Sequence, residues 1–235
     1  MSREGDRAVT DPGTQIRPPL VTRTFLLITA ATFAYFIAVG TMLPVLPRYV
    51  EGPLGKGSVA VGLSVGSFSL VALLLRPLAG RLGDRRGRRL LIVLGSAVVA
   101  CSVAALTVAT SLSVLILLRL CTGAGEAFFF TGVASAIHDL APDDRRGEAV
   151  SYFSLALYAG LAVGPILGEG ILGDRNFSAV WWVAAALCGL AAVLALRLPD
   201  TRSAAPRSPG RSRLVHPAAV VPGVVVTTSV WGFSG

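Results

Sequence analysis

The sequence predicts an all-α membrane protein: a bundle of six transmembrane helices followed by the start of a seventh. The composition is the first observation, because hydrophobic residues make up 53% of the 235 residues and charged residues only 14%. A soluble domain has roughly 25% charged residues. The second observation is that charge-free stretches recur at about the length, roughly 20 residues, that crosses a bilayer as a helix. The third is an uneven distribution of basic residues between the connections.

Each apolar stretch corresponds to one predicted span. The spans are expected near 24–47, 57–79, 90–110, 112–137, 149–172 and 177–197, and a seventh begins near 218. The long region after residue 90 is divided in two because "ATSLS" at 109–113 forms a polar break. The expected organisation is a polar tail (1–23), the six-helix bundle (24–197), an Arg/Pro/Ser-rich linker (198–217) and an incomplete seventh span (218–235).

The basic residues predict the orientation of the chain. If the spans alternate, sixteen of the 21 Lys and Arg residues lie in the tail and in the connections near 80–89, 138–148 and 197–216. The connections on the other side carry three, which are Arg48, Lys56 and Arg175. Positive charge is retained on the cytoplasmic side. The prediction is therefore a multi-pass protein of the cell membrane with a cytoplasmic N-terminus, and no cleavable signal is expected because the first apolar run is too long.

The connection between the second and third predicted spans reads "GRLGDRRGRR" at 80–89. Glycines permit a tight turn between two helices, and one acid among five arginines indicates a specific partner. The segment resembles the signature of the major facilitator superfamily of secondary transporters at this position, roughly G-x-L-x-D-R-x-G-R-R. The matching residues are Gly80, Asp84, Arg85, Gly87, Arg88 and Arg89.

Two further motifs carry the same resemblance. "LLRLCTGAGEA" at 117–127 resembles the family's fourth-span motif R-x-x-x-G-x-G, and "GLAVGPILGEG" at 160–170 resembles its fifth-span motif G-x-x-x-G-P-x-x-G-G. The fifth-span motif is associated with exporters that exchange substrate for protons. The matching residues are Arg119, Gly123 and Gly125 in the fourth span, and Gly160, Gly164, Pro165 and Gly168 in the fifth.

The resemblance covers about 20–235 and matches the N-terminal half of a twelve-span fold. It implies a secondary transporter that exports a small organic molecule or drug in exchange for protons, by alternating access. The implied partners are the small-molecule substrate, protons, the lipid bilayer and a C-terminal half that is missing from this chain and needed for activity. It also implies that Asp84 faces a helix N-terminus in that other half and latches the cytoplasmic side.

Physical chemistry singles out Arg119 and Glu126 as candidates for substrate and proton coupling. A charge near the bilayer centre costs roughly 2.5–3.5 kcal/mol on insertion scales. Seven residues of helix place the two side chains on one face about 10 Å apart, and both are expected to point into the bundle or a wet cavity. Arginine stays charged, whereas a buried glutamate can gain and lose a proton. The alternative is a pair that only holds the bundle together.

The fifth-span glycines recur every fourth residue on one helix face, so another helix can pack closely there. Pro165 removes a backbone donor and bends the helix. The alternative is ordinary close packing with no relation to antiport, because small residues at this spacing also occur in "GLSVG" at 62–66.

Other classes of function are disfavoured. An uptake symporter of the same fold is the main alternative to export. "GLSVG" has the G-x-S-x-G form of a hydrolase nucleophile around Ser64, but no base is expected within reach, so the chain is not expected to be an enzyme. The flanking apolar spans argue against nucleic-acid binding by the basic run. Cys101, Cys121 and Cys188 lack metal-ligand spacing and are interpreted as small buried residues, so no metal or cofactor is expected.

Overall fold

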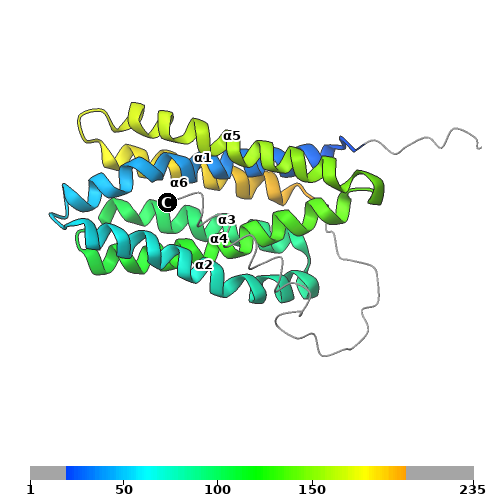
Figure 1. The fold of residues 1–235 in the computed structure, drawn as a ribbon, viewed down its shortest axis with the longest axis horizontal. Coiled ribbons are helices and arrows are strands. Elements are labelled where there is room, and N and C mark those ends of the chain that lie inside the picture. The colour runs from blue at the N-terminus through cyan, green and yellow to red at the C-terminus, as the bar shows by residue number, and fades with distance from the viewer. Residues whose placement is uncertain (1–19, 200–235) are drawn as a thin grey trace, which may run out of the picture.

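The structure, a computed structural model, describes residues 20–199 as a bundle of long helices (Figure 1). The six long helices of this part of the chain are α1 (Arg23–Glu51), α2 (Ser58–Arg86), α3 (Arg88–Ala104), α4 (Leu112–Leu140), α5 (Arg146–Leu172) and α6 (Phe177–Leu196). Two short 3-10 turns, η1 (Ala105–Val108) and η2 (Asp143–Arg145), continue α3 and precede α5. The linker beyond 199 and the predicted seventh span lie outside the described residues.

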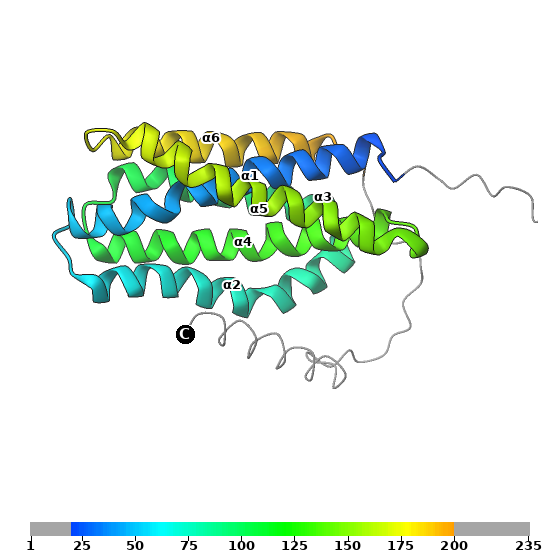
Figure 2. The ribbon, with the colours of Figure 1, turned by 45° about the horizontal axis from the view of Figure 1, so that its top comes forward.

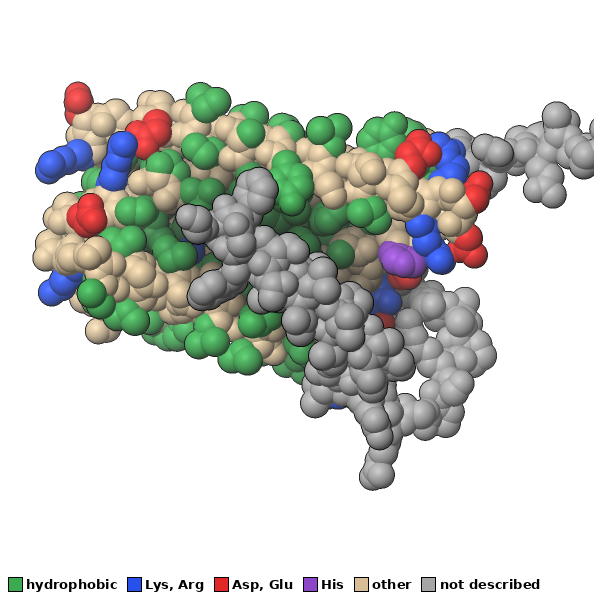
Figure 3. Space-filling model, viewed as in Figure 1, with side chains coloured by type: hydrophobic (Ala, Val, Ile, Leu, Met, Phe, Trp, Pro, Cys, Tyr) green, Lys and Arg blue, Asp and Glu red, His purple; other side chains and the backbone are tan. Residues whose placement is uncertain are grey.

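All six helices are long and apolar enough to cross a membrane. Their flanks are rich in hydrophobic side chains, and the charged side chains gather at the two ends of the bundle (Figure 3). The arginine-rich end contains the start of α1, the α2–α3 and α4–α5 connections and the end of α6. The opposite end contains the α1–α2, α3–α4 and α5–α6 connections (Figure 1). The prediction of an all-helical bundle with six spans is confirmed for the described residues.

The helices pack in an order that differs from their order in the chain. α1 packs mainly against α5 and α6, α3 against α4 and α6, and α2 against α4. The packing order is therefore α5–α1–α6–α3–α4–α2, with α2 and α5 at its two ends (Figure 1). Figure 2 shows α4 lying alongside α2. Each end helix has one main partner, and both leave large apolar side chains exposed, including Leu73 and Leu74 of α2 and Leu155 and Ile166 of α5.

The basic segment 80–89 is not the loop that the sequence predicts. α2 continues to Arg86, and only Gly87 leaves helical geometry, with a φ of 94° that favours glycine. The loop prediction is wrong because residues 80–86 keep their backbone hydrogen bonds within the helix. Gly83 is needed there for packing, since a Cβ atom would lie 2.9 Å from both the Arg88 side chain and Leu91. Gly80, by contrast, faces open space.

Glycines bring α5 close to α1 along most of its length. A Cβ atom at Gly160 would lie 2.9 Å from the Phe33 carbonyl oxygen, and one at Gly164 would lie 2.6 Å from the Cα of Gly40. Gly168 faces the backbone of Thr41 in the same way. The close packing predicted from the spacing of these glycines is therefore confirmed. Pro165 lies inside α5, which continues through it to Leu172.

The three cysteines differ in their surroundings. Cys188 is buried, Cys121 is partly buried and Cys101 is exposed. The expectation that all three are buried is therefore wrong for Cys101, because this residue lies on the outer face of α3. His138 is exposed at the arginine-rich end.

Candidate functional site

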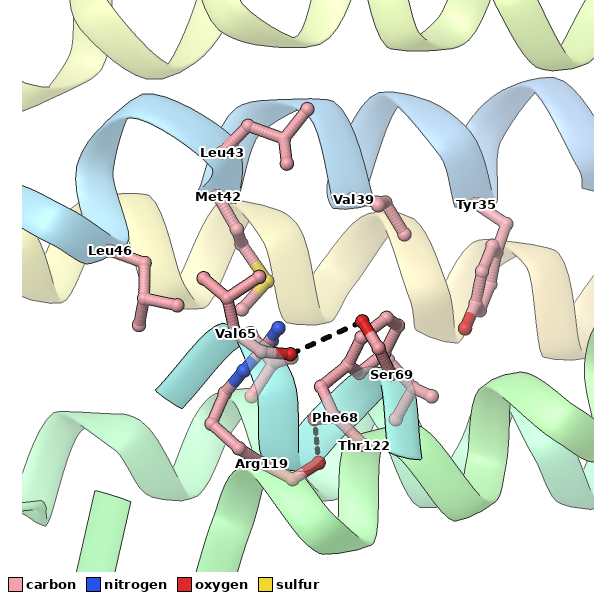
Figure 4. A pocket seen from close by; sticks show the side chains of 12 residues that line it. Tyr35, Val39, Met42, Leu43, Leu46, Val65, Phe68, Ser69, Arg119 and Thr122 are labelled. Carbon is pink, nitrogen blue, oxygen red and sulfur yellow. Dashed lines mark hydrogen bonds between the residues drawn. The ribbon is translucent and has the colours of Figure 1, made fainter. Parts of the chain in front are cut away.

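A cavity of about 200 Å³ lies between α1, α2, α3 and α4, in the half of the bundle nearer the opposite end (Figure 4). Its walls are mostly apolar, and Arg119 is the charged residue in them. Leu43 of α1 and Val65 of α2 are 57% and 46% exposed, so the cavity is open on the side where these helices face each other. The lining residues are Tyr35, Val39, Met42, Leu43, Leu46, Val65, Phe68, Ser69, Val99, Val103, Arg119 and Thr122.

Arg119 is held in place by α2. Its Nε donates a hydrogen bond to the Ser64 carbonyl oxygen at 3.2 Å, and its guanidinium lies 4.5 Å from the centre of the Phe68 ring. A cation over an aromatic face is stabilised by about 2 kcal/mol or more when the pair is desolvated. These contacts need a close approach of α4 and α2, which Gly123 provides. A Cβ atom there would lie 3.1 Å from the Phe68 carbonyl carbon and still closer to its oxygen. Gly125 makes the matching approach to α3 at Gly95.

Glu126 lies at the middle of α4 and is also buried, with 7% of its surface exposed. Its carboxyl oxygen Oε2 is buried and has no hydrogen-bond partner within the described part of the chain. The same holds for the hydroxyl oxygen of Tyr35, on α1, which interacts with the Glu126 side chain. Leaving a buried polar group unpaired costs about 1–3 kcal/mol, so two such groups side by side call for a functional explanation.

The burial predicted for Arg119 and Glu126 is confirmed, but the two residues are not direct partners. No ion pair joins them within residues 20–199. Tyr35 is near both residues, because it meets the Glu126 side chain and lines the same cavity as Arg119. The nearby cation that acts on the Glu126 carboxyl group is Arg76 of α2, whose guanidinium lies 4.7 Å from the centre of the Phe130 ring.

The signature residues at 80–89 form an ion-pair cluster at the arginine-rich end. Arg88, which is buried, donates from Nη1 to Asp84 at 2.7 Å and from Nε to Asp139 at 3.1 Å. The cluster therefore joins the end of α2, the start of α3 and the end of α4. Of the other signature arginines, Arg85 is exposed and Arg89 is partly exposed.

Replacing Arg88 by alanine is expected to lower the thermal stability of the bundle. The loss is about 1–2 kcal/mol, because hydrogen bonds to charged groups contribute about 1.5–3 kcal/mol and partial exposure of the two carboxylates reduces this contribution. Thermal aggregation of the purified chain in detergent measures the effect. Arg85→Ala, at an exposed arginine of the same turn, is the matched control and is expected to change stability by about 0.5 kcal/mol at most. Equal melting temperatures for the two variants would contradict the proposed contribution of the cluster.

A second ion pair lies at the opposite end. Nη1 of Arg48 on α1 lies 2.5 Å from Oε2 of Glu169 on α5, and both side chains are well exposed. Exposed pairs contribute about 0–1 kcal/mol. Glu169, which replaces the second glycine of the fifth-span motif, therefore lies at the solvated end of its helix, as the sequence suggests.

Three side chains of the cavity wall and of the ion-pair cluster were not identified from the sequence. Tyr35 and Phe68 belong to apolar runs, where nothing in the sequence distinguishes a residue of the cavity wall from one that faces lipid. Asp139 was recognisable as an acid at the end of the fourth span, but its pairing with Arg88 depends on how α3 and α4 meet.

Ser64 donates its hydroxyl to the Ala60 carbonyl oxygen at 2.8 Å, as buried helical serines do, so it has the bonding of a structural residue.

A bundle of six membrane-length helices with a cavity and buried charges between them is an arrangement that membrane transport proteins use. The chain belongs to the Major Facilitator Superfamily, whose family profile matches residues 28–234. Members of this family are transporters and not enzymes.

Curated relatives give the same assignment. The chain is 28% identical to "Multidrug resistance protein 1" of Bacillus subtilis (strain 168) over 221 aligned residues. The alignment covers 91% of the chain and 56% of the relative. It is 30% identical to "Quinolone resistance protein NorA" of Staphylococcus aureus over 166 aligned residues. That alignment covers 71% of the chain and 42% of the relative. The chain thus spans about half the length of the curated relatives that it matches.

Proposed function

We propose that the chain forms one half of a proton-coupled exporter of small, largely apolar organic molecules. The observation that supports this proposal best is the open apolar cavity, which has Arg119 in its wall and the buried carboxyl group of Glu126 beyond Tyr35. An apolar pocket with a few polar groups is the usual form of a small-molecule site. A buried carboxyl group with an unpaired oxygen is a suitable proton carrier. The names of the relatives point to drug-like molecules as the substrate class.

The complete transporter requires a second six-helix bundle in this proposal. Alternating access in this family proceeds by rocking of two bundles around a site near the membrane midplane. The exposed apolar faces of α2 and α5 provide surfaces for such a partner. Asp84, which pairs with Arg88 inside this bundle, would also serve as the latch toward the second bundle, since a carboxylate at a helix N-terminus contributes about 0.3–1 kcal/mol.

Binding and transport test the proposal separately. The chain in lipid nanodiscs is expected to bind a fluorescent quinolone, and Phe68→Ala, which opens the cavity wall, is expected to weaken that binding by about tenfold (1.4 kcal/mol). In liposomes the 235-residue chain alone is expected to give no proton-driven flux, and co-reconstitution with a second six-span bundle is expected to restore it. An unchanged quinolone affinity in the Phe68→Ala variant, or proton-driven flux by the chain alone, would contradict the proposal.

The direction of transport distinguishes export from the alternative, uptake by symport. The glycine and proline pattern of α5 supports export, since this motif is associated with antiporters. Inside-out vesicles that carry the complete transporter would accumulate substrate when a proton gradient drives export and would fail to do so in the case of uptake. Accumulation in right-side-out vesicles whose exterior is the acidic side would instead support the symporter.

We also propose that the arginine-rich end faces the cytoplasm, because basic residues are retained on that side. Single cysteines at Ser2, Lys56 and Ser203 in a cysteine-free background test this orientation. An impermeant thiol reagent added to intact cells is expected to label Lys56→Cys and to leave the other two unlabelled. Labelling of Ser2→Cys or Ser203→Cys would reverse the assignment.

A further inference from the structure

Tyr35 stands between the cavity and Glu126. Its ring forms one end of the cavity wall along α1, and Leu46 lies at the other end (Figure 4). Glu126 is not a lining residue, although it interacts with the Tyr35 hydroxyl. Tyr35 is thus the residue of the cavity wall that meets the Glu126 side chain.

The Tyr35 ring is fixed from several sides. It stacks on the Phe129 ring at a centroid distance of 3.8 Å and an interplanar angle of 14°, and it meets Phe36 edge-on at 5.5 Å. Tyr35 and Phe129 are both completely buried. The hydroxyl group, in contrast, has no hydrogen-bond partner within the described part of the chain. A side chain whose ring is held firmly and whose hydroxyl meets a buried carboxyl group is well placed for a positioning role.

We propose that Tyr35 is the gate between the cavity and Glu126: its ring closes the carboxyl group off from the cavity, and its hydroxyl positions that group. The inference rests on the proposed proton-coupling role of Glu126 and extends it to a residue on another helix. Movement of the Tyr35 ring away from Phe129 would join the carboxyl group to the cavity. Proton transfer between the two would then occur only in that arrangement.

Among the charged and titratable groups around Glu126, Tyr35 is the one that lies on the cavity side. Arg76 on α2 acts on its carboxyl group electrostatically, and the carboxyl group in turn acts on Cys188 of α6. Arg119, on the same helix, acts on Tyr35. α3 faces this part of α4 with the glycine and valine at 95 and 99, which do not titrate. Tyr35 on α1 is thus the titratable group that both touches Glu126 and lines the cavity.

Chemical labelling of Glu126 tests the closed path. Dicyclohexylcarbodiimide, an apolar reagent, adds to protonated carboxyl groups, and mass spectrometry of the nanodisc-embedded chain locates the adduct, with Glu126→Gln as the control for the assignment. Tyr35→Ala, which removes the ring, is expected to speed the labelling of Glu126 by at least about tenfold, because a minor open state is populated at roughly 0.1–10%. Tyr35→Phe keeps the ring and is expected to label at a rate within about twofold of wild type at acidic pH.

A second measurement tests the hydroxyl group. The pH profile of labelling is expected to differ between Tyr35→Phe and wild type, because removal of the hydroxyl changes which protonation state of the carboxyl group is stabilised. Tyr158→Phe, at a 68% exposed tyrosine of α5, is the matched control and should keep the wild-type profile. If Tyr35→Ala does not insert, Phe129→Leu, which removes the ring on which Tyr35 rests, is expected to speed labelling as well.

The outcomes separate the gate from the proposed function. Equal labelling rates in wild type and in the ring-deleted variants, or a pH profile unchanged in Tyr35→Phe, would overturn the gate and leave the coupling role of Glu126 standing. Absence of Glu126 labelling in every variant from about pH 5 to about pH 9 would overturn the coupling role and the gate together. Faster labelling after loss of the ring, combined with an altered profile after loss of the hydroxyl, would support both parts of the inference.

Discussion

Replacing Gly164 by leucine is expected to prevent the six helices from forming a stable bundle. A single Cβ atom at this position would lie 2.6 Å from the backbone atoms of Gly40 and Ile37, and backbone cannot rotate away as a side chain can. Overpacking in a well-packed core costs about 1–3 kcal/mol and occasionally more; against backbone we expect the upper end or beyond. The measurement is the yield of monodisperse protein after detergent extraction and its thermal stability.

Gly66→Leu is the matched control for this prediction. Gly62 and Gly66 on α2 have the same four-residue spacing as the α5 glycines, but no atom of residues 20–199 lies within 4 Å of a Cβ atom at either position. The control variant is therefore expected to extract and melt like wild type. If the Gly164 and Gly66 variants behave alike, the close approach of α5 to α1 does not contribute to stability as the structure indicates.

Replacing Glu126 by glutamine is expected to abolish proton-driven export by the complete transporter while leaving the protein in the membrane. Glutamine has nearly the same volume and fits the same buried site, but it cannot carry a proton. Exchange of labelled for unlabelled substrate without a proton gradient is expected to survive, because that reaction does not need the proton. Flux into inside-out vesicles, measured with and without the gradient, checks both parts.

Two variants sharpen this second prediction. Glu169→Gln removes another α-helical acid, but one that is exposed at the opposite end beside Arg48; it is expected to transport normally. Arg119→Lys keeps the charge but loses the planar guanidinium that lies on the Phe68 ring, so a weaker substrate affinity is expected. Normal gradient-driven export by the glutamine variant at 126 would exclude the coupling role.

The sequence predicted the elements of this fold well because each depends on local properties. Apolar length defined the six spans, and the polar break at 109–113 falls where α3 and η1 end and α4 begins. The burial of Arg119 and Glu126 also followed from local physics, since charges inside a span are expensive unless they face the protein. The glycine spacing in α5 predicted a close helix contact, although not which helix would make it.

The pairings between helices could not be predicted in this way. The spacing of Arg119 and Glu126 on one helix suggested that they act on each other, yet contacts from α1 and α2 separate them: Phe68 holds the arginine and Tyr35 meets the glutamate. The prediction of a loop at the basic segment 80–89 was wrong for a related reason. Charge and glycine together are typical of a loop, but the carboxylates of Asp84 and Asp139 neutralise Arg88 and allow the helices to continue to a single turning residue, Gly87.

The order in which the helices pack also determines when, during synthesis, α1 can meet its main partners. α1 is made first, but its main partners, α5 and α6, begin at Arg146 and Phe177. At a synthesis rate of about 5–20 residues per second, the first helix waits on the order of 5–25 seconds for α5 to be completed. During that time its Tyr35 hydroxyl and the glycine face at Gly40 have no partner from this chain other than α2, α3 and α4. During synthesis α1 therefore stays without its main packing partners until α5 and then α6 have been added.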